Sequence, residues 1–182
     1  MKLASALRLA RVSLLPTVWT NVLAGAALAG RDPLDLRVLL AMAAVSLAYT
    51  GGMFLNDAFD RDFDARLRPD RPIPAGEVSA RQVFAWGYAM LGASVLLPAA
   101  FRQWRAAMAG VLLCLAIVLY DAHHKHNPLS PLLMGSCRLL VYVVAALAVG
   151  GQLGPGVWLG AAALLGYLIG LSHKLGRSLT DS

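Results

Sequence analysis

Long apolar segments alternate with short polar connections along most of this chain. Each segment holds about 20 residues, the length that an α-helix needs to cross the hydrocarbon core of a bilayer. The pattern predicts six such helices, at about 9–29, 36–59, 81–101, 104–122, 131–149 and 156–173. We therefore expect an all-α fold, a polytopic transmembrane helical bundle that forms a single membrane domain over residues 1–182.

The composition supports a membrane protein rather than a soluble one. Hydrophobic residues make up 58% of the 182 residues and charged residues 14%, whereas a soluble domain carries about 25% charge. The net charge of +6 does not indicate nucleic-acid binding, because the basic residues lie singly or in short clusters between apolar segments. We expect membrane lipid, and no nucleic acid, among the partners.

The basic residues are distributed unevenly between the two ends of the predicted helices. If the helices alternate in direction, one side receives Arg31, Arg37, Arg102 and Arg105, and the other receives the remaining 11 basic residues apart from Arg138, which falls inside the fifth helix. Cytoplasmic loops carry the excess of lysine and arginine in membrane proteins. The pattern therefore predicts that both termini and the connections 61–80 and 123–130 are cytoplasmic.

Acidic residues concentrate where the second predicted helix ends. On a helix, Asn56, Asp57, Asp60 and Asp64 cover an arc of only about 100°, while Asp62 points away. Three carboxylates this close together at a membrane boundary repel one another and need a cation to compensate them.

The sequence allows two interpretations of this cluster. A solvated helix end, with carboxylates paired to nearby arginines, explains Asp62 but not why the polar stripe begins directly after Met53-Phe54-Leu55. Oxygen ligands without histidine or cysteine suit Mg²⁺, which bridges to phosphate oxygens. We therefore predict Mg²⁺ as cofactor, with Asn56, Asp57, Asp60 and Asp64 as ligands. Guanidinium groups beside such a metal bind phosphate, which makes Arg66 and Arg71 candidates for diphosphate binding.

The segment from Asn56 to Asp64 resembles the NDxxDxxxD motif of the UbiA superfamily of intramembrane prenyltransferases. The stretch Arg71-Pro-Ile-Pro-Ala-Gly76 resembles the RPI-x-x-G segment that follows this motif, and Arg11 to Gly25 is similar to the family's opening helix. The resemblance implies Mg²⁺-dependent transfer of a prenyl group from an isoprenoid diphosphate to an aromatic or lipophilic acceptor within the membrane. It also implies that Asp60 and Asp64 are catalytic.

Further site residues follow the resemblance. Lys125 is similar to a family lysine near a tyrosine that contacts the diphosphate. Arg138 is a charge inside a membrane helix, which is costly unless it is paired or lines a polar cavity. An ion pair to Asp121 and a contact with the diphosphate or an acidic acceptor both remain open for it. The candidates for substrate or acceptor contacts are Arg11, Asn21, Tyr120 and Asp121.

The chain departs from the family in one respect. Family members have about nine helices and a second DxxxD motif, but beyond Asp121 this sequence has a single acidic residue, Asp181. We expect either an incomplete enzyme, the N-terminal two-thirds of a UbiA-like fold, or a substitute group such as Asp121. A prenyltransferase-like protein that binds without turnover is one alternative. A CDP-alcohol phosphatidyltransferase is another, although its motif requires Gly at Arg61 and Ala at Asp64.

Overall fold

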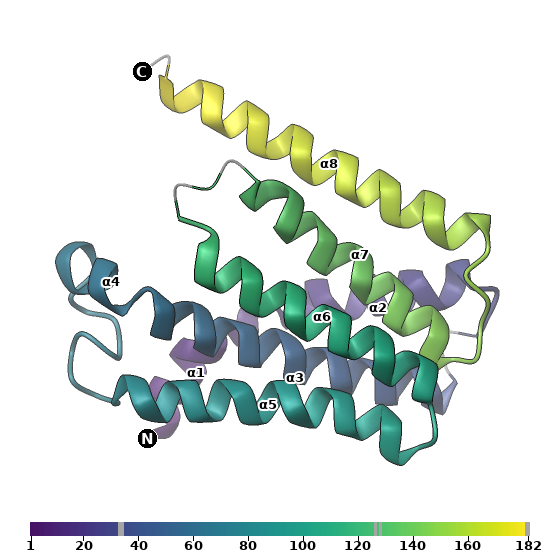
Figure 1. The fold of residues 1–182 in the computed structure, drawn as a ribbon, viewed down its shortest axis with the longest axis horizontal. Helices are drawn as coiled ribbons and strands as arrows, with labels where there is room; N and C mark the ends of the chain where they lie inside the picture. Colours follow the sequence, from purple (N-terminus) through teal and green to yellow (C-terminus); the bar gives the residue numbers. More distant parts are fainter. Residues whose placement is uncertain (33–34, 126, 128, 181–182) are drawn as a thin grey trace.

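The computed structural model describes residues 1–32, 35–125, 127 and 129–180; from Leu168 onward, Gly170 apart, only the course of the helix is described. In these ranges every regular element is helical (Figure 1). The elements are α1 (Leu3–Ala10), the 3-10 turn η1 (Val12–Leu14), α2 (Leu15–Leu28), α3 (Leu36–Phe59), α4 (Arg61–Leu67), α5 (Ala80–Ala100), α6 (Trp104–His123), α7 (Ser130–Ala148) and α8 (Pro155–Thr180).

The prediction of a multi-pass helical bundle is confirmed. Four helices, α3, α5, α6 and α7, are long and apolar enough to cross a membrane, and two shorter apolar helical segments cover Val12–Leu28 and Pro155–Tyr167. These six segments match the six predicted ones, and the bounds of α3 agree with the predicted 36–59. Of the sixth predicted helix, 156–173, the side chains of Leu168, Ile169 and 171–173 lie outside the described residues, as does Asp181.

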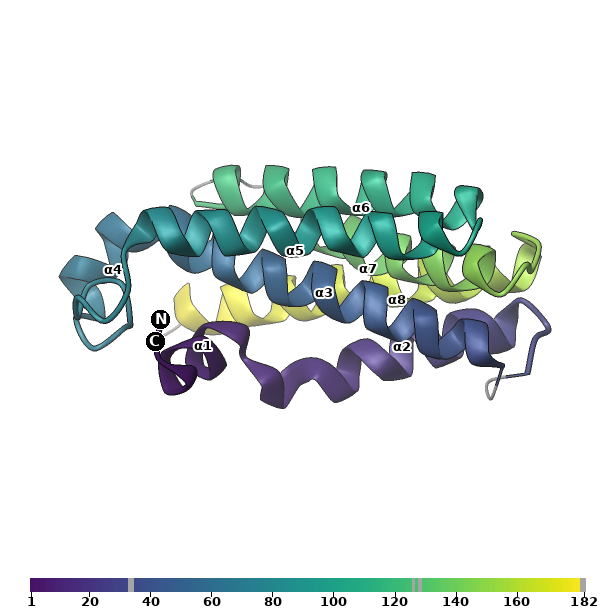
Figure 2. The same cartoon turned by 90° about the horizontal axis from the view of Figure 1, so that it is seen from below.

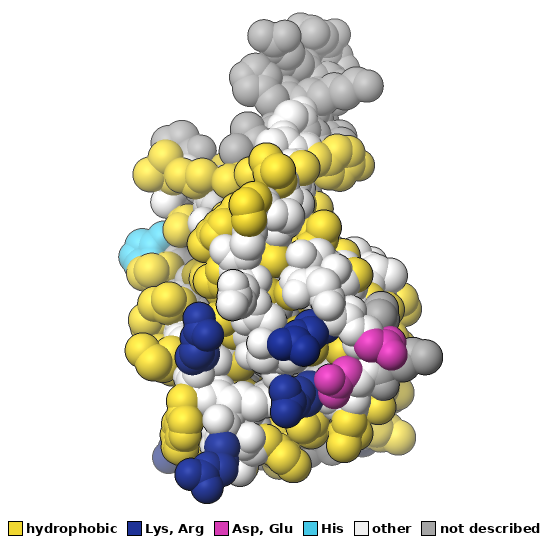
Figure 3. Space-filling model, turned by 90° about the vertical axis from the view of Figure 1, so that its right-hand side faces the viewer, with side chains coloured by type: hydrophobic (Ala, Val, Ile, Leu, Met, Phe, Trp, Pro, Cys, Tyr) yellow, Lys and Arg dark blue, Asp and Glu magenta, His cyan; other side chains and the backbone are white. Residues whose placement is uncertain are grey.

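The long helices lie side by side, with α3 packed against α2, α5, α6 and α7 (Figures 1 and 2). The C-terminal ends of α3 and α6 and the N-terminal end of α7 meet at one end of the bundle, together with α1 and α4. We call this the motif end, because it carries the aspartates. The opposite end holds the α2–α3, α5–α6 and α7–α8 connections, and basic side chains gather on it (Figure 3).

The prediction of one continuous helix over 9–29 is wrong. Arg11 adopts a left-handed backbone conformation, with φ of 44°, and divides this stretch into α1 and α2. Pro16 follows at the start of α2, where its missing N–H group leaves no helical hydrogen bond unmade. The break lets α1 turn across the motif end, where Leu9 and Ala10 pack against Phe54 and Ala58 of α3.

Helix α1 is also tied to the polar connection that precedes α5. The hydroxyl of Ser5 donates a hydrogen bond of 2.7 Å to Glu77 Oε2, and Arg8 Nη1 lies 2.9 Å from Glu77 Oε1. Arg8 also donates to the backbone carbonyl of Asp70. These contacts hold α1 against the segment that leads to Arg71, so α1 indirectly supports the aspartate motif.

This attachment should depend on pH in acid. The hydrogen bond from Ser5, and then the charge of Arg8, lower the pKa of Glu77 below its ordinary 4.5. A lowered folded-state pKa gives stability that is present above the ordinary value and is lost as the pH falls through the folded-state value. The protection factors of the α1 amides in hydrogen exchange, which are corrected for the intrinsic pH dependence of the rate, should therefore be high at pH 6 and fall below about pH 4. In Glu77→Gln, protection factors that are still high at pH 6 and still fall in acid would contradict this role of Glu77.

Helices α3 and α5 approach closely through glycines. A Cβ placed on Gly51 would lie 2.8 Å from the backbone oxygen of Gly87, whereas a Cβ on Gly92, also in α5, would meet nothing within 4 Å. We expect Gly51→Ala to destabilise the protein by about 1–3 kcal/mol, because backbone must move. We expect Gly92→Ala to stabilise it by up to about 1 kcal/mol through helix propensity. Thermal unfolding in detergent would compare the two, and equal shifts would contradict the tight α3–α5 contact.

Candidate active site at the aspartate motif

Three aspartates of the motif are buried on one face, as the helical arc predicts. The side chains of Asp57, Asp60 and Asp64 are 7%, 12% and 1% exposed, whereas that of Asp62 is 81% exposed. Helix α3 ends at Phe59, yet the Asp64 N–H still donates to the Asp60 carbonyl at 2.9 Å, so a helical turn continues from α3 into α4. The arc predicted for one helix is therefore preserved across two.

Two arginines neutralise the most buried of these carboxylates. Arg71 Nη1 lies 3.0 Å from Asp57 Oδ1 and 2.8 Å from Asp64 Oδ2, so one guanidinium bridges both side chains. Arg11 Nη2 lies 2.8 Å from Asp57 Oδ1 and 3.5 Å from Asn56 Oδ1. The left-handed turn at Arg11 therefore places its side chain at the end of α3.

Asp60 has a cationic partner from the other side of the site. Lys125 Nζ, just beyond α6, lies 2.8 Å from Asp60 Oδ1 and 4.2 Å from the centre of the Phe63 ring. His124 Nε2 lies 3.6 Å from Asp60 Oδ2, and its ring stacks on Tyr120. The geometry thus brings the predicted residue Lys125 onto the motif, and it adds His124, which the sequence did not single out.

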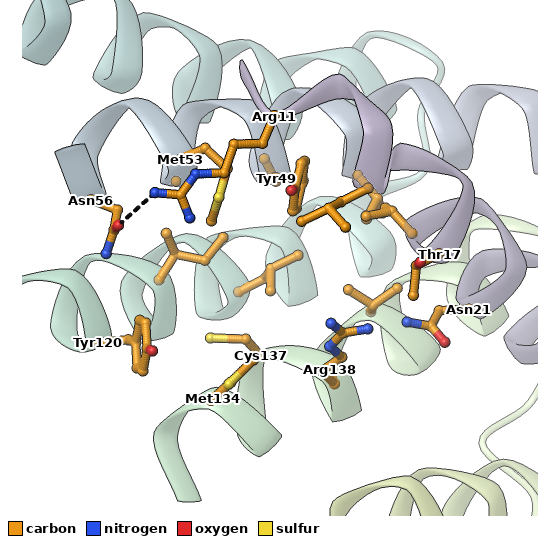
Figure 4. A pocket seen from close by; sticks show the side chains of 18 of the residues that line it. Arg11, Thr17, Asn21, Tyr49, Met53, Asn56, Tyr120, Met134, Cys137 and Arg138 are labelled. Carbon is orange, nitrogen blue, oxygen red and sulfur yellow. Dashed lines mark hydrogen bonds between the residues drawn. The ribbon is translucent and has the colours of Figure 1, made fainter. Parts of the chain in front are cut away.

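A cavity of about 310 Å³ opens beneath the motif between α2, α3, α6 and α7 (Figure 4). Its walls are mostly apolar, with Asn56, Tyr120 and Asp121 at the motif end. Asn56 donates a hydrogen bond of 3.3 Å to Asp121 Oδ1, while the buried Asp121 Oδ2 has no hydrogen-bond partner among the described residues. An apolar chamber that begins at a charged rim suits a long hydrocarbon chain with an anionic head.

Polar groups also line the deeper part of the cavity. Arg138 of α7 and Asn21 of α2 lie near one another, away from Asn56 (Figure 4). Tyr49 lines the same cavity, and its buried hydroxyl has no hydrogen-bond partner in the described part of the chain. The expected alternative of an ion pair between Arg138 and Asp121 is not formed: the Arg138 side chain makes no ion pair or hydrogen bond with any described residue.

Most predicted site residues come together at the motif end, whereas Arg138 and Asn21 line the cavity away from it and Arg66 lies outside the site. Arg66 lies on the exposed side of α4 and donates only to the backbone carbonyl of Asp62, at 3.3 Å. Tyr49 was missed by the sequence analysis, although a signal existed. It precedes Asn56 by seven residues, which is two helical turns and therefore the same face of α3.

The carboxylates are compensated by side chains in this structure. Within the described ranges, no three His, Cys, Asp or Glu side chains converge as a ready-made metal site. Their oxygens nevertheless fit Mg²⁺ chemically, since they are hard donors, and the buried Asp64 Oδ1 accepts no hydrogen bond from a described residue. Arg71, Arg11 and Lys125 supply the positive charge that a metal would otherwise bring.

A comparison with known protein families agrees with the site described above. The model of the UbiA prenyltransferase family matches residues 14–176. The chain belongs to the UbiA prenyltransferase family. As a UbiA protein with four long apolar helices, it is an integral membrane protein, and its motif is not that of a CDP-alcohol phosphatidyltransferase.

Several UbiA relatives carry the same name. The chain is 32% identical over 166 residues to digeranylgeranylglyceryl phosphate synthase of Methanopyrus kandleri, covering 88% of this chain and 58% of the relative. It is 29% identical over 154 residues to the synthase of that name from Metallosphaera sedula, covering 82% and 52%. The chain thus spans a little over half the length of these relatives.

A solved UbiA-like structure, from work on digeranylgeranylglyceryl phosphate synthase in membranes, has the same arrangement of helices. The TM-score is 0.75, over 90% of this chain and 57% of that chain, at 24% identity. This likeness concerns the fold alone.

Proposed function

We propose that this UbiA protein transfers a prenyl group from an isoprenoid diphosphate to a lipophilic acceptor that carries a phosphate. The observation that carries the proposal is a row of three buried carboxylates, ion-paired to Arg11, Arg71 and Lys125, beside an apolar cavity that Arg11 and Asn56 line. The names of the relatives support a glyceryl phosphate acceptor rather than an aromatic one.

In the proposed binding mode, Mg²⁺ and the diphosphate replace the ion pairs that the resting protein forms between its carboxylates and its basic side chains. Asn56, Asp57, Asp60 and Asp64 would hold Mg²⁺, which when bound draws charge from the leaving diphosphate. Arg71, Arg11 and Lys125 would then be released from the carboxylates and would turn to the phosphate oxygens. The site has no excess of either sign in the resting protein, so it does not need to bury an uncompensated charge before the substrate arrives.

The rest of the proposed mechanism rests on the cavity. The donor's hydrocarbon chain lies against the apolar walls, which exclude the water that would otherwise capture the allylic carbon as its bond to the diphosphate breaks. The acceptor hydroxyl attacks that carbon and loses a proton. We propose that the unpartnered Asp121 Oδ2, at the motif end of the cavity, accepts this proton.

We also propose that the motif end faces the cytoplasm. The loops and termini on that side carry 11 basic residues, whereas the opposite side carries four, and cytoplasmic loops carry the excess of lysine and arginine.

A turnover assay tests the function. The purified chain in lipid nanodiscs is supplied with geranylgeranyl diphosphate, geranylgeranylglyceryl phosphate and Mg²⁺, and the prenylated product and free diphosphate are quantified. Equal amounts of both support the proposal. Binding of the diphosphate without consumption would instead favour a prenyltransferase-like protein without turnover, an alternative that the ion-paired motif carboxylates also allow. No binding at all would reject both.

A further inference from the structure

Arg138 occupies an unusual position in this bundle. It lies eight residues into α7, about 12 Å along the helix axis from its first residue, and it faces the cavity without an ion-pair partner among the described residues. A charge at this depth in a membrane helix is costly and is retained where it pairs with something or binds something.

The other charged groups of the cavity are already engaged. Arg11 is committed to Asp57 and Asn56 at the motif end. Asp121, the acidic residue in the cavity wall, accepts its hydrogen bond from Asn56 rather than from Arg138. Arg138 therefore carries a positive charge that the described side chains do not neutralise, in a chamber with the unpartnered hydroxyl of Tyr49.

We propose that Arg138, with Asn21 and the Tyr49 hydroxyl, binds the phosphate of the acceptor at a subsite distinct from that of the diphosphate. This inference rests on the proposed function and assigns to Arg138 the acceptor rather than the donor. Arginine supplies a fork of N–H donors that matches phosphate oxygens, and Asn21 and Tyr49 add a neutral amide and a hydroxyl.

The position of Tyr49 along α3 indicates how deep this subsite lies. Tyr49 lies seven residues before Asn56 on the same face of α3, about 10 Å deeper than the metal-binding arc. The donor's reacting carbon is bonded to the diphosphate at the motif end, and the acceptor hydroxyl must reach it from within the cavity. In a glyceryl phosphate the hydroxyl and the phosphate are separated by only a few bonds, so a phosphate held at Arg138 keeps the hydroxyl within the cavity that opens to the motif end.

Two titrations on the full chain in phosphatidylcholine nanodiscs test the assignment. Glycerol phosphate is titrated by calorimetry, with uncharged glycerol as a control, and geranylgeranyl diphosphate is titrated with Mg²⁺. Arg138→Gln should weaken glycerol phosphate binding by about tenfold or more, the contribution of a charge-assisted hydrogen bond. Arg138→Lys should recover part of it, and binding of geranylgeranyl diphosphate should change less than twofold in both. The matched control is Arg81→Gln, because Arg81 is exposed in the first turn of α5 and should alter neither titration.

Unfolding temperature separates this subsite from a structural role. If Arg138 waits for a ligand, Arg138→Gln in the unliganded protein should leave the unfolding temperature unchanged or raise it, because an unpaired charge is removed. A clear decrease would reveal a structural partner and overturn the proposal. Unchanged glycerol phosphate binding, absent binding in the wild type, or a parallel loss of diphosphate binding would also overturn it. Failure of the wild type to bind geranylgeranyl diphosphate would instead reject the proposed function, while the glycerol phosphate titration still decides the role of Arg138.

Discussion

Replacing Asp60 by asparagine is expected to weaken Mg²⁺-dependent binding of geranylgeranyl diphosphate by about 100-fold, from the loss of a charged ligand at a buried position. Asp60 is directed into the site, where Lys125 lies 2.8 Å from its Oδ1. The exchange keeps the shape of the side chain and removes the charge, so it separates metal binding from packing. Equilibrium binding of the diphosphate with and without Mg²⁺ measures the effect.

The matched control lies two residues further along the chain. The side chain of Asp62 is 81% exposed and its ion pair with Arg61, at 3.6 Å, is on the surface. Asp62→Asn should therefore leave the affinity within twofold, since exposed pairs contribute little. Similar losses from the two variants would contradict the view that only the inward face of the motif binds the metal.

Removal of Arg71 should produce the largest loss of stability in the site. Its guanidinium bridges Asp57 and Asp64, and the Asp64 side chain is 1% exposed. Arg71→Met would leave the buried Asp64 with only Arg68, at 3.8 Å, as an ion-pair partner, whereas Asp57 would keep Arg11 at 2.8 Å. We expect a loss of about 3 kcal/mol in the free energy of unfolding, measured by equilibrium denaturation in detergent.

A second substitution tests the cause of that loss. In the double variant Arg71→Met with Asp64→Asn, the uncompensated charge of Asp64 is gone, so the double variant should be more stable than Arg71→Met alone. Arg61→Met is the matched control, with an expected change within about 0.5 kcal/mol because its ion pair is exposed. A double variant less stable than Arg71→Met would show that packing, not charge, dominates at this position.

The sequence predicted the inward face of the motif because helical spacing alone separates Asp57, Asp60 and Asp64 from Asp62. A continuous helix is not required for this, since the helical turn at Asp60 keeps the spacing intact. The break at Arg11 was not predictable in the same way. It depends on a left-handed residue, and arginine is not a residue type that marks this conformation.

Which side chains pair with one another at the site could also not be predicted from the sequence. Arg66 and Arg71 are both arginines after the motif, but only Arg71 turns back onto it, because the connection between α4 and α5 folds under α1. Likewise Arg138 has a carboxylate, Asp121, on the adjacent helix, yet Asn56 takes that carboxylate instead. Such choices depend on how helices rotate against one another, which periodicity does not specify.

In the proposed function, the motif exchanges its resident cations for Mg²⁺ and diphosphate together. Mg²⁺ alone must displace Arg71 and Lys125 without giving them new partners, whereas the diphosphate provides those partners, so the two ligands should bind cooperatively. Titration of geranylgeranyl diphosphate into the chain at zero and at several fixed Mg²⁺ concentrations measures this coupling directly. We predict that the affinity rises at least about tenfold as Mg²⁺ approaches saturation. An affinity independent of Mg²⁺ would contradict this exchange of cations.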